Sequence, residues 1–152
     1  MNSERLYQVV LKTLETIPLA EYENEERQLQ PYLREKICNV LETSFPGKCG
    51  VKMSIGGKKR PRVDLFGTNF WPDMEVSMDG KPILAIEVKL AKKSLAAAIS
   101  GTIGQCILYK LKYEHALGFI KNQARTSPQY NEYDGKLRDM LNGLKVPLII
   151  RS

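Results

Sequence analysis

Two charged pairs, Asp73 with Glu75 and Glu87 with Lys89, alternate with apolar residues along two neighbouring stretches of the chain. Carboxylates that share one surface repel each other unless a cation lies between them, and their oxygens are preferred ligands of Mg²⁺ and Mn²⁺. Such an ion activates a water molecule and neutralises charge on a phosphate. In a strand, Lys89 lies about 6.6 Å beyond Glu87 on the same face, where its amine could position the attacking water.

The two stretches are joined by Asp79-Gly80, which is a strong signal for a hairpin. A two-residue turn would mix the polar and apolar faces of the two strands. A three-residue loop with Gly80 left-handed keeps the apolar faces together, because it places Asp73 opposite Ala85 and diagonally beside Glu87. We therefore expect the three-residue loop, with the charged residues on one face of the sheet.

The residues Pro72-Asp73 and Glu87-Val88-Lys89, with thirteen residues between the aspartate and the glutamate, resemble the motif of the PD-(D/E)XK nuclease superfamily. That superfamily includes restriction endonucleases, archaeal Holliday-junction resolvases and RecB-type exonucleases. The resemblance implies that Asp73 and Glu87 are metal ligands and that Lys89 is the catalytic lysine. It also implies that the backbone carbonyl of Val88 completes the shell of a Mg²⁺ or Mn²⁺ ion.

The resemblance covers roughly residues 24–121 and implies a fold class. We expect an α/β protein with a three-layer, restriction-endonuclease-like αβββαβ core, a mixed central sheet, and added N- and C-terminal elements. The 152 residues are enough for one domain and few for two. We therefore expect a single nuclease-like domain over 1–152.

The periodicity of apolar residues predicts the elements that such a core needs. Pro31 is expected either to kink the second helix or to lie in its first turn. We predict helices over 4–17, 24–43, 94–113 and 131–142, strands over 51–55, 73–78, 83–90, 116–121 and 146–150, and an extended piece over 62–66.

The helix predicted over 94–113 contains Gln105 and Tyr109, and this Gln-x-x-x-Tyr spacing resembles one in the same helix of RecB-type nucleases. On a helical wheel the two residues lie nearly opposite an apolar stripe that is expected to face the core. We therefore expect Gln105 and Tyr109 to hold the substrate or the catalytic lysine, with a solvated helix face as the alternative. The stripe comprises Ile99, Ile103, Ile107 and Leu111.

An acidic residue in the upstream helix is also expected from the resemblance. Glu26 lies at the centre of an apolar arc on a helical wheel, where a carboxylate is costly without a partner. The run 26–29 also resembles the first-helix motif of archaeal junction resolvases. Glu26 is therefore a candidate catalytic residue and metal ligand, with Glu25 as the alternative, unless both are acids that favour the helix N-terminus. The arc comprises Leu29, Leu33, Ile37 and Leu41.

The charge of the chain favours a polyanionic partner. Lys and Arg total 23 against 17 Asp and Glu, a net charge of +6, and a basic balance favours nucleic acid. Basic residues before and after the hairpin are expected to contact phosphates in a salt-sensitive way. These residues are Lys58, Lys59, Arg60, Lys92 and Lys93.

Several other classes are disfavoured by the composition. The longest weakly polar stretch, 95–108, falls short of the roughly 18–20 apolar residues that span a bilayer. The N-terminus lacks the apolar region of a secretory signal, and the three cysteines are too scattered for a disulfide framework. We expect a cytoplasmic protein with no membrane partner.

The residues together favour a Mg²⁺- or Mn²⁺-dependent nuclease that hydrolyses phosphodiester bonds, with DNA expected before RNA. Specificity in so small a nuclease would come from a partner protein or from a homodimer. The alternative is a nucleic-acid-binding or assembly module that keeps the fold without cleaving. A third reading is a basic scaffold protein in which the motif arises by chance.

Overall fold

The computed structural model describes residues 2–19, 26–54, 61–123 and 132–152, with the side chains of residues 26 and 27 excepted. No helix within these ranges is both long enough and apolar enough to cross a membrane. In chain order the elements are α1 (Asn2–Thr16), α2 (Glu26–Ser44), β1 (Cys49–Met53), β2 (Val63–Leu65), β3 (Thr68–Phe70), β4 (Met74–Met78), β5 (Lys81–Ala91), α3 (Leu95–Tyr109), β6 (His115–Asn122), α4 (Glu132–Gly143) and β7 (Leu148–Arg151).

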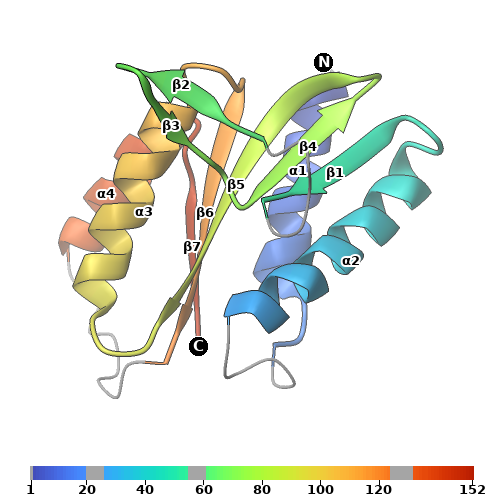
Figure 1. The fold of residues 1–152 in the computed structure, drawn as a ribbon. Helices are drawn as coiled ribbons and strands as arrows, with labels where there is room; N and C mark the ends of the chain where they lie inside the picture. The colour runs from blue at the N-terminus through green and yellow to red at the C-terminus, as the bar shows by residue number, and fades with distance from the viewer. Residues whose placement is uncertain (1, 20–25, 55–60, 124–131) are drawn as a thin grey trace.

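Five strands of the described chain form one mixed sheet in the order β1-β4-β5-β6-β7 (Figure 1). β1, β4 and β5 are antiparallel neighbours, whereas β5, β6 and β7 run parallel. Parallel neighbours need a crossover connection, and α3 and α4 lie in the two crossovers. The chain is therefore an α/β protein with a mixed central sheet, as the sequence predicts. β2 and β3 pair with each other in a separate hairpin.

The larger core lies between the sheet and the helices α1 and α2, which cover one face (Figure 1). Alternate residues of each strand point to this face, and each large apolar side chain buried there contributes about 1.5–3 kcal/mol. The predicted arc of α2 is confirmed as part of this core, and Pro31 lies inside α2 beyond its first turn, on the exposed side. Fully buried members include Leu6, Val10, Leu29, Leu33, Ile37, Val76, Leu84, Ile86 and Phe119.

α3 packs against the opposite face of the sheet through small and polar side chains. The oxygen of Ser94 accepts a hydrogen bond from the N–H of Ala97 and caps the start of the helix. Thr102 is fully buried against β6. A Cβ atom added at Gly118 would lie 2.5 Å from Cγ2 of Thr102, so the missing side chain lets the helix approach the sheet closely.

The prediction that the apolar stripe of this helix faces the core is wrong. Ile107 and Leu111 are 47% and 65% exposed, and Leu111 lies beyond the end of α3 at Tyr109. Ile99 and Ile103 are only half-buried. The prediction assumed that the most apolar side of a helix faces the core, but this sheet face holds buried carboxylates and takes polar partners.

The register of the β4–β5 hairpin also differs from the prediction. Met78 pairs with Lys81, so Asp79-Gly80 is a two-residue turn in which both residues are left-handed, with φ of 52° and 78°. The predicted three-residue loop is therefore wrong. Beside Val76 the register then shifts, because β5 holds one extra residue between two paired positions. This β-bulge restores the separation of polar and apolar faces.

Candidate active site

The two acidic residues of the motif meet where β4 begins alongside β5. Met74 pairs with Ile86, so one further step along the antiparallel register places Asp73 opposite Glu87. The N–H of Val88, with no β4 partner there, donates to Oδ2 of Asp73 at 2.7 Å. Asp73 is therefore directly opposite Glu87 rather than diagonal to it, because the bulge shifts the register by one residue in the direction opposite to that of the predicted loop.

Glu87 is 2% exposed and lies at the centre of the cluster. Burial raises the pKa of Glu87, and the negative charge of Asp73 raises it further, to about 7. The Tyr109 hydroxyl donates to Oε2 at 2.8 Å, and Nζ of Lys89 lies 3.3 Å from Oε1. Both contacts lower the pKa without offsetting burial. Below about pH 7 Glu87 therefore keeps a proton that a bound cation would displace.

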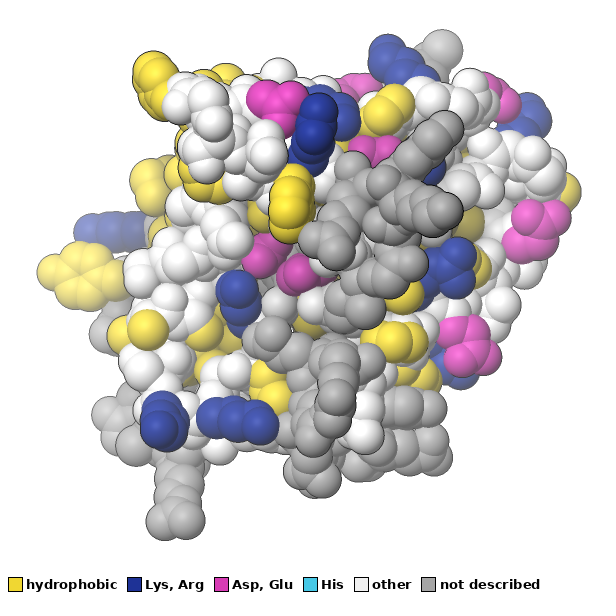
Figure 2. Space-filling model, in the orientation of Figure 1, with side chains coloured by type: hydrophobic (Ala, Val, Ile, Leu, Met, Phe, Trp, Pro, Cys, Tyr) yellow, Lys and Arg dark blue, Asp and Glu magenta, His cyan; other side chains and the backbone are white. Residues whose placement is uncertain are grey.

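The cluster reaches solvent through Lys89, whose side chain is 35% exposed. Figure 2 shows acidic and basic side chains close together near the middle of this face of the molecule. A substrate phosphate arriving there would meet the lysine amine first, with Glu87 behind it.

Tyr109 has a different contact from the one predicted. Its side chain is fully buried, so in the structure it holds Glu87 rather than a substrate. Burial and the neighbouring Glu87 raise the pKa of Tyr109 far above its ordinary value, so the phenol stays protonated and remains a donor. Gln105 lies one turn earlier on α3 and is half-buried; its contact with substrate or lysine stays a prediction.

A second buried acid, Glu75, lies on the same face and is 4% exposed. The hydroxyl of Tyr113 donates to its Oε2, and Nζ of Lys112 lies 3.8 Å from the same oxygen. Burial raises the pKa of Tyr113, and its bond to Glu75 raises it further. The sequence candidates did not include Tyr113. Its spacing of four residues from Tyr109 was the available signal, since side chains so spaced lie one above the other.

The donor set fits one hard divalent cation with part of its shell left open. Asp73 and Glu87 offer carboxylate oxygens, which Mg²⁺ and Mn²⁺ prefer. In a strand the N–H and C=O of one residue point to the same side, so the carbonyl of Val88 lies on the edge of β5 at which its N–H meets Asp73. The described residues contain no group of three or more His, Cys, Asp or Glu side chains placed to hold a metal. Water or phosphate would therefore supply the remaining ligands, as Mg²⁺ commonly allows.

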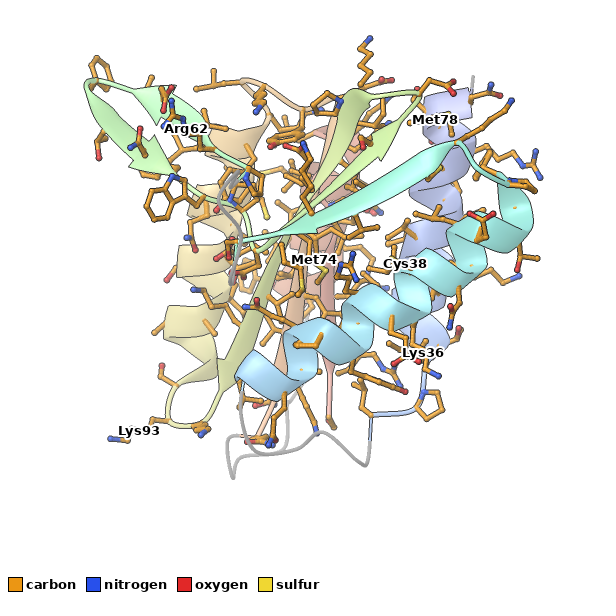
Figure 3. All side chains as sticks on the ribbon, turned by 45° about the vertical axis from the view of Figure 1, so that its right-hand side comes forward. Lys36, Cys38, Arg62, Met74, Met78 and Lys93 are labelled. Atoms are coloured by element: carbon orange, nitrogen blue, oxygen red, sulfur yellow. The ribbon has the colours of Figure 1, made fainter. Side chains whose placement is uncertain are left out.

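The other predicted residues lie away from this cluster or outside the described part of the chain. Lys92 and Lys93 are exposed in the loop between β5 and α3, and Figure 3 shows Lys93 projecting from that loop. The backbone of Glu26 begins α2, but its side chain is not described. Lys58, Lys59, Arg60 and Glu25 lie outside the described residues.

No protein-family model matches the chain, and no curated protein or solved structure matches it significantly. The likeness to the PD-(D/E)XK motif therefore stays a likeness of residues and spacing. A function for this chain has to be argued from the chemistry of the cluster around Glu87.

Proposed function

We propose that the chain is a Mg²⁺- or Mn²⁺-dependent nuclease that hydrolyses phosphodiester bonds in nucleic acid, with DNA as the expected polymer. The order α2-β1-β4-β5-α3-β6 supports a restriction-endonuclease-like core, because it repeats the αβββαβ order that the motif implies. The antiparallel run β1-β4-β5, followed by the parallel strand β6, agrees with it. On this proposal α1, the β2–β3 hairpin, α4 and β7 are additions to the core.

The meeting of Asp73, Glu87 and Lys89 at the start of β4 is the observation that carries the proposal. A purely structural role for this cluster is unfavourable, because burying Glu87 beside a second carboxylate costs free energy that an apolar side chain would not. Groups with perturbed pKa values beside a lysine that reaches solvent are typical of functional sites. The types and positions of the three residues match the ligands and the lysine of the motif.

In the proposed reaction, Asp73, Glu87 and the carbonyl of Val88 would hold the cation, which would supply Lewis-acid chemistry beside the scissile phosphate. The amine of Lys89 holds the attacking water and places positive charge near the phosphate oxygens, where negative charge develops. Tyr109 keeps the Glu87 carboxylate in one orientation through its hydrogen bond.

The test is a cleavage assay on labelled linear, circular, single-stranded and branched DNA and on RNA, each with Mg²⁺, Mn²⁺ or EDTA. We expect metal-dependent cleavage that falls at least about 100-fold in Asp73→Asn and in Lys89→Met. Asp79→Asn and Lys81→Met make the same chemical changes at the exposed end of the same hairpin. Asparagine tolerates the left-handed backbone at 79, and we expect both control variants to cut at the wild-type rate.

Two results would contradict the nuclease proposal. Folded wild-type protein that binds nucleic acid in a salt-sensitive way but never cuts it would favour the non-catalytic binding module. A protein that neither binds nor cuts would favour a motif that arises by chance. Equal loss of cleavage in Asp73→Asn and Asp79→Asn would leave the nuclease function intact, but it would place the chemistry elsewhere on the hairpin.

A further inference from the structure

The turn at the tip of the β2–β3 hairpin contains a residue that folding does not explain. Phe66 is 97% exposed, with a φ of 51° in the left-handed region that bulky side chains rarely adopt. Gly67 follows with a φ of 71° and completes a two-residue turn. Phenylalanine is unfavourable here for two reasons, because its ring lies in water and its backbone is strained.

The other two-residue turn of the described chain shows which residues this geometry ordinarily takes. Asp79 and Gly80 have φ values of 52° and 78° between β4 and β5. Aspartate tolerates the left-handed region, and Asp-Gly is a favoured pair for such turns. Because the chain uses Asp-Gly where a turn only joins two strands, the phenylalanine at 66 needs another reason.

The hairpin is fastened beside the candidate active site. β3 ends at Phe70, three residues before Asp73. Nζ of Lys112 donates to the carbonyl of Arg62 at 3.1 Å, which ties the start of the hairpin to the segment after α3. Figure 1 shows β2 and β3 projecting past the sheet, and Figure 3 shows Arg62 at this hairpin. Seven extended residues span at most about 24 Å, so Phe66 lies within one turn of a DNA duplex from Asp73.

A single ring in polar surroundings fits a nucleic-acid base better than a protein surface. The neighbouring Asp64, Thr68 and Asn69 are polar and exposed, so the exposed apolar surface at the tip of the hairpin is confined to one side chain. Each partner in a stable protein complex buries about 800 Å², whereas a base offers one flat face of matching size. Trp71, which is 43% exposed, supplies a second ring closer to Asp73.

We propose that Phe66 is a wedge that stacks on an unpaired base next to the cleavage site. The substrate is then a nucleic acid with forked, branched or single-stranded segments rather than uninterrupted duplex. This inference rests on the proposed nuclease function and deepens it by naming the substrate class. Stacking on one base strengthens binding by about 5- to 150-fold, and a paired duplex offers the same contact only after its bases are unstacked.

The test measures binding without metal to plain duplex, forked and single-stranded DNA that carries 2-aminopurine at the fork or within the single strand. Glycine adopts the left-handed backbone without strain, so Phe66→Gly is expected to fold with an unchanged or higher Tm. We expect Phe66→Gly to lose at least about 5-fold in affinity for forked and single-stranded DNA and to abolish the fluorescence change. Its affinity for plain duplex should be unchanged, and Phe66→Trp should behave as wild type.

Equal affinity of wild type and Phe66→Gly for forked DNA, with the same fluorescence, would overturn the wedge while leaving cleavage and the nuclease function intact. Wild-type protein that stacks the base but cuts nothing would support the wedge and contradict the nuclease function. Self-association that depends on Phe66, with unchanged DNA binding, would assign the ring to a contact between copies of the chain and overturn the inference.

Discussion

The two faces of the central sheet are built by the same strands but hold different kinds of residue. Toward α1 and α2, β4 and β5 contribute apolar side chains such as Val76, Leu84 and Ile86. Toward α3, the alternate positions include Glu75 and Glu87, which are 4% and 2% exposed. The first face stabilises the fold by removing apolar area from water, whereas carboxylates on the second are tolerated only through hydrogen bonds and ion pairs. Stability and candidate chemistry thus lie on opposite sides of one layer.

Truncation on the apolar face should give the largest loss of stability. Leu84 is fully buried toward α1 and α2, so Leu84→Ala should lower the free energy of unfolding by about 2–5 kcal/mol, through lost transfer free energy and the cavity that remains. Urea denaturation followed by circular dichroism measures this change. A loss below about 1 kcal/mol would mean that this face is not the main source of stability, and the contrast between the faces would fail.

Replacing the buried Glu87 on the other face with an uncharged residue should change how the free energy of unfolding depends on pH. The folded-state pKa of Glu87 is about 7, above the ordinary 4.5. Below pH 4.5 the folded and unfolded chains both hold the proton, whereas between 4.5 and 7 only the folded chain keeps it. Stability therefore falls as pH rises through this range, by on the order of 3 kcal/mol at about 1.4 kcal/mol per pKa unit.

Glu87→Gln cannot lose this proton, so its stability should fall less than that of wild type between pH 4.5 and pH 8. Chemical denaturation without metal at the two pH values measures both slopes. Mg²⁺ should stabilise the wild type more at pH 8 than at pH 5, because binding requires the carboxylate. Identical pH dependence in the two proteins would contradict the raised pKa.

The apolar face could be predicted from the sequence because burial follows the period of a helix or strand. The arc that includes Leu33 and Ile37 is buried as its spacing predicts. The turn at Asp79-Gly80 also follows its local signal, since the pair favours two residues. The bulge that corrects the register lies farther along β5 and depends on how the two strands pack as a pair. No local residue pattern marks the bulge, so the prediction placed the change of register in the turn instead.

The two tyrosine–glutamate pairs on the α3 face allow a finer comparison. Tyr109→Phe removes a hydrogen bond that lowers the pKa of Glu87, so cleavage should require a higher pH than in wild type. Tyr113→Phe removes the hydrogen-bond donor to Glu75, but Nζ of Lys112 still lies 3.8 Å from Glu75. This variant should therefore leave the pH profile of cleavage unchanged. Each variant should lose about 1–3 kcal/mol of stability, because a buried acceptor loses its partner.

Cleavage rates from pH 5.5 to 9, beside urea denaturation of both variants, measure these effects. An equal shift of the pH profile in Tyr113→Phe would mean that the two acids act as one unit. No shift in Tyr109→Phe would mean that its hydroxyl does not control the ionisation of Glu87.

The charged residues of the candidate site were easier to predict than their partners. Alternation places Asp73, Glu87 and Lys89 on one face whichever turn joins the strands, provided the apolar faces stay together. The partners depend on which side of α3 meets the sheet. A helical wheel ranks sides by hydrophobicity, but here the buried carboxylates select the side that carries Tyr109. The same preference leaves Ile107 in solvent.

The prediction with the smallest expected effect tests which side of α3 faces the sheet. Ile37 and Ile107 both lie on stripes that the sequence predicts to be core, but Ile37 is fully buried and Ile107 is 47% exposed. Ile37→Ala should cost about 2–5 kcal/mol, whereas Ile107→Ala should change stability by less than about 0.5 kcal/mol. Alanine also favours helix more than isoleucine does, which offsets part of any lost contact. Similar losses at both positions would mean that α3 presents its apolar stripe to the sheet, and Tyr109 would then have to leave Glu87.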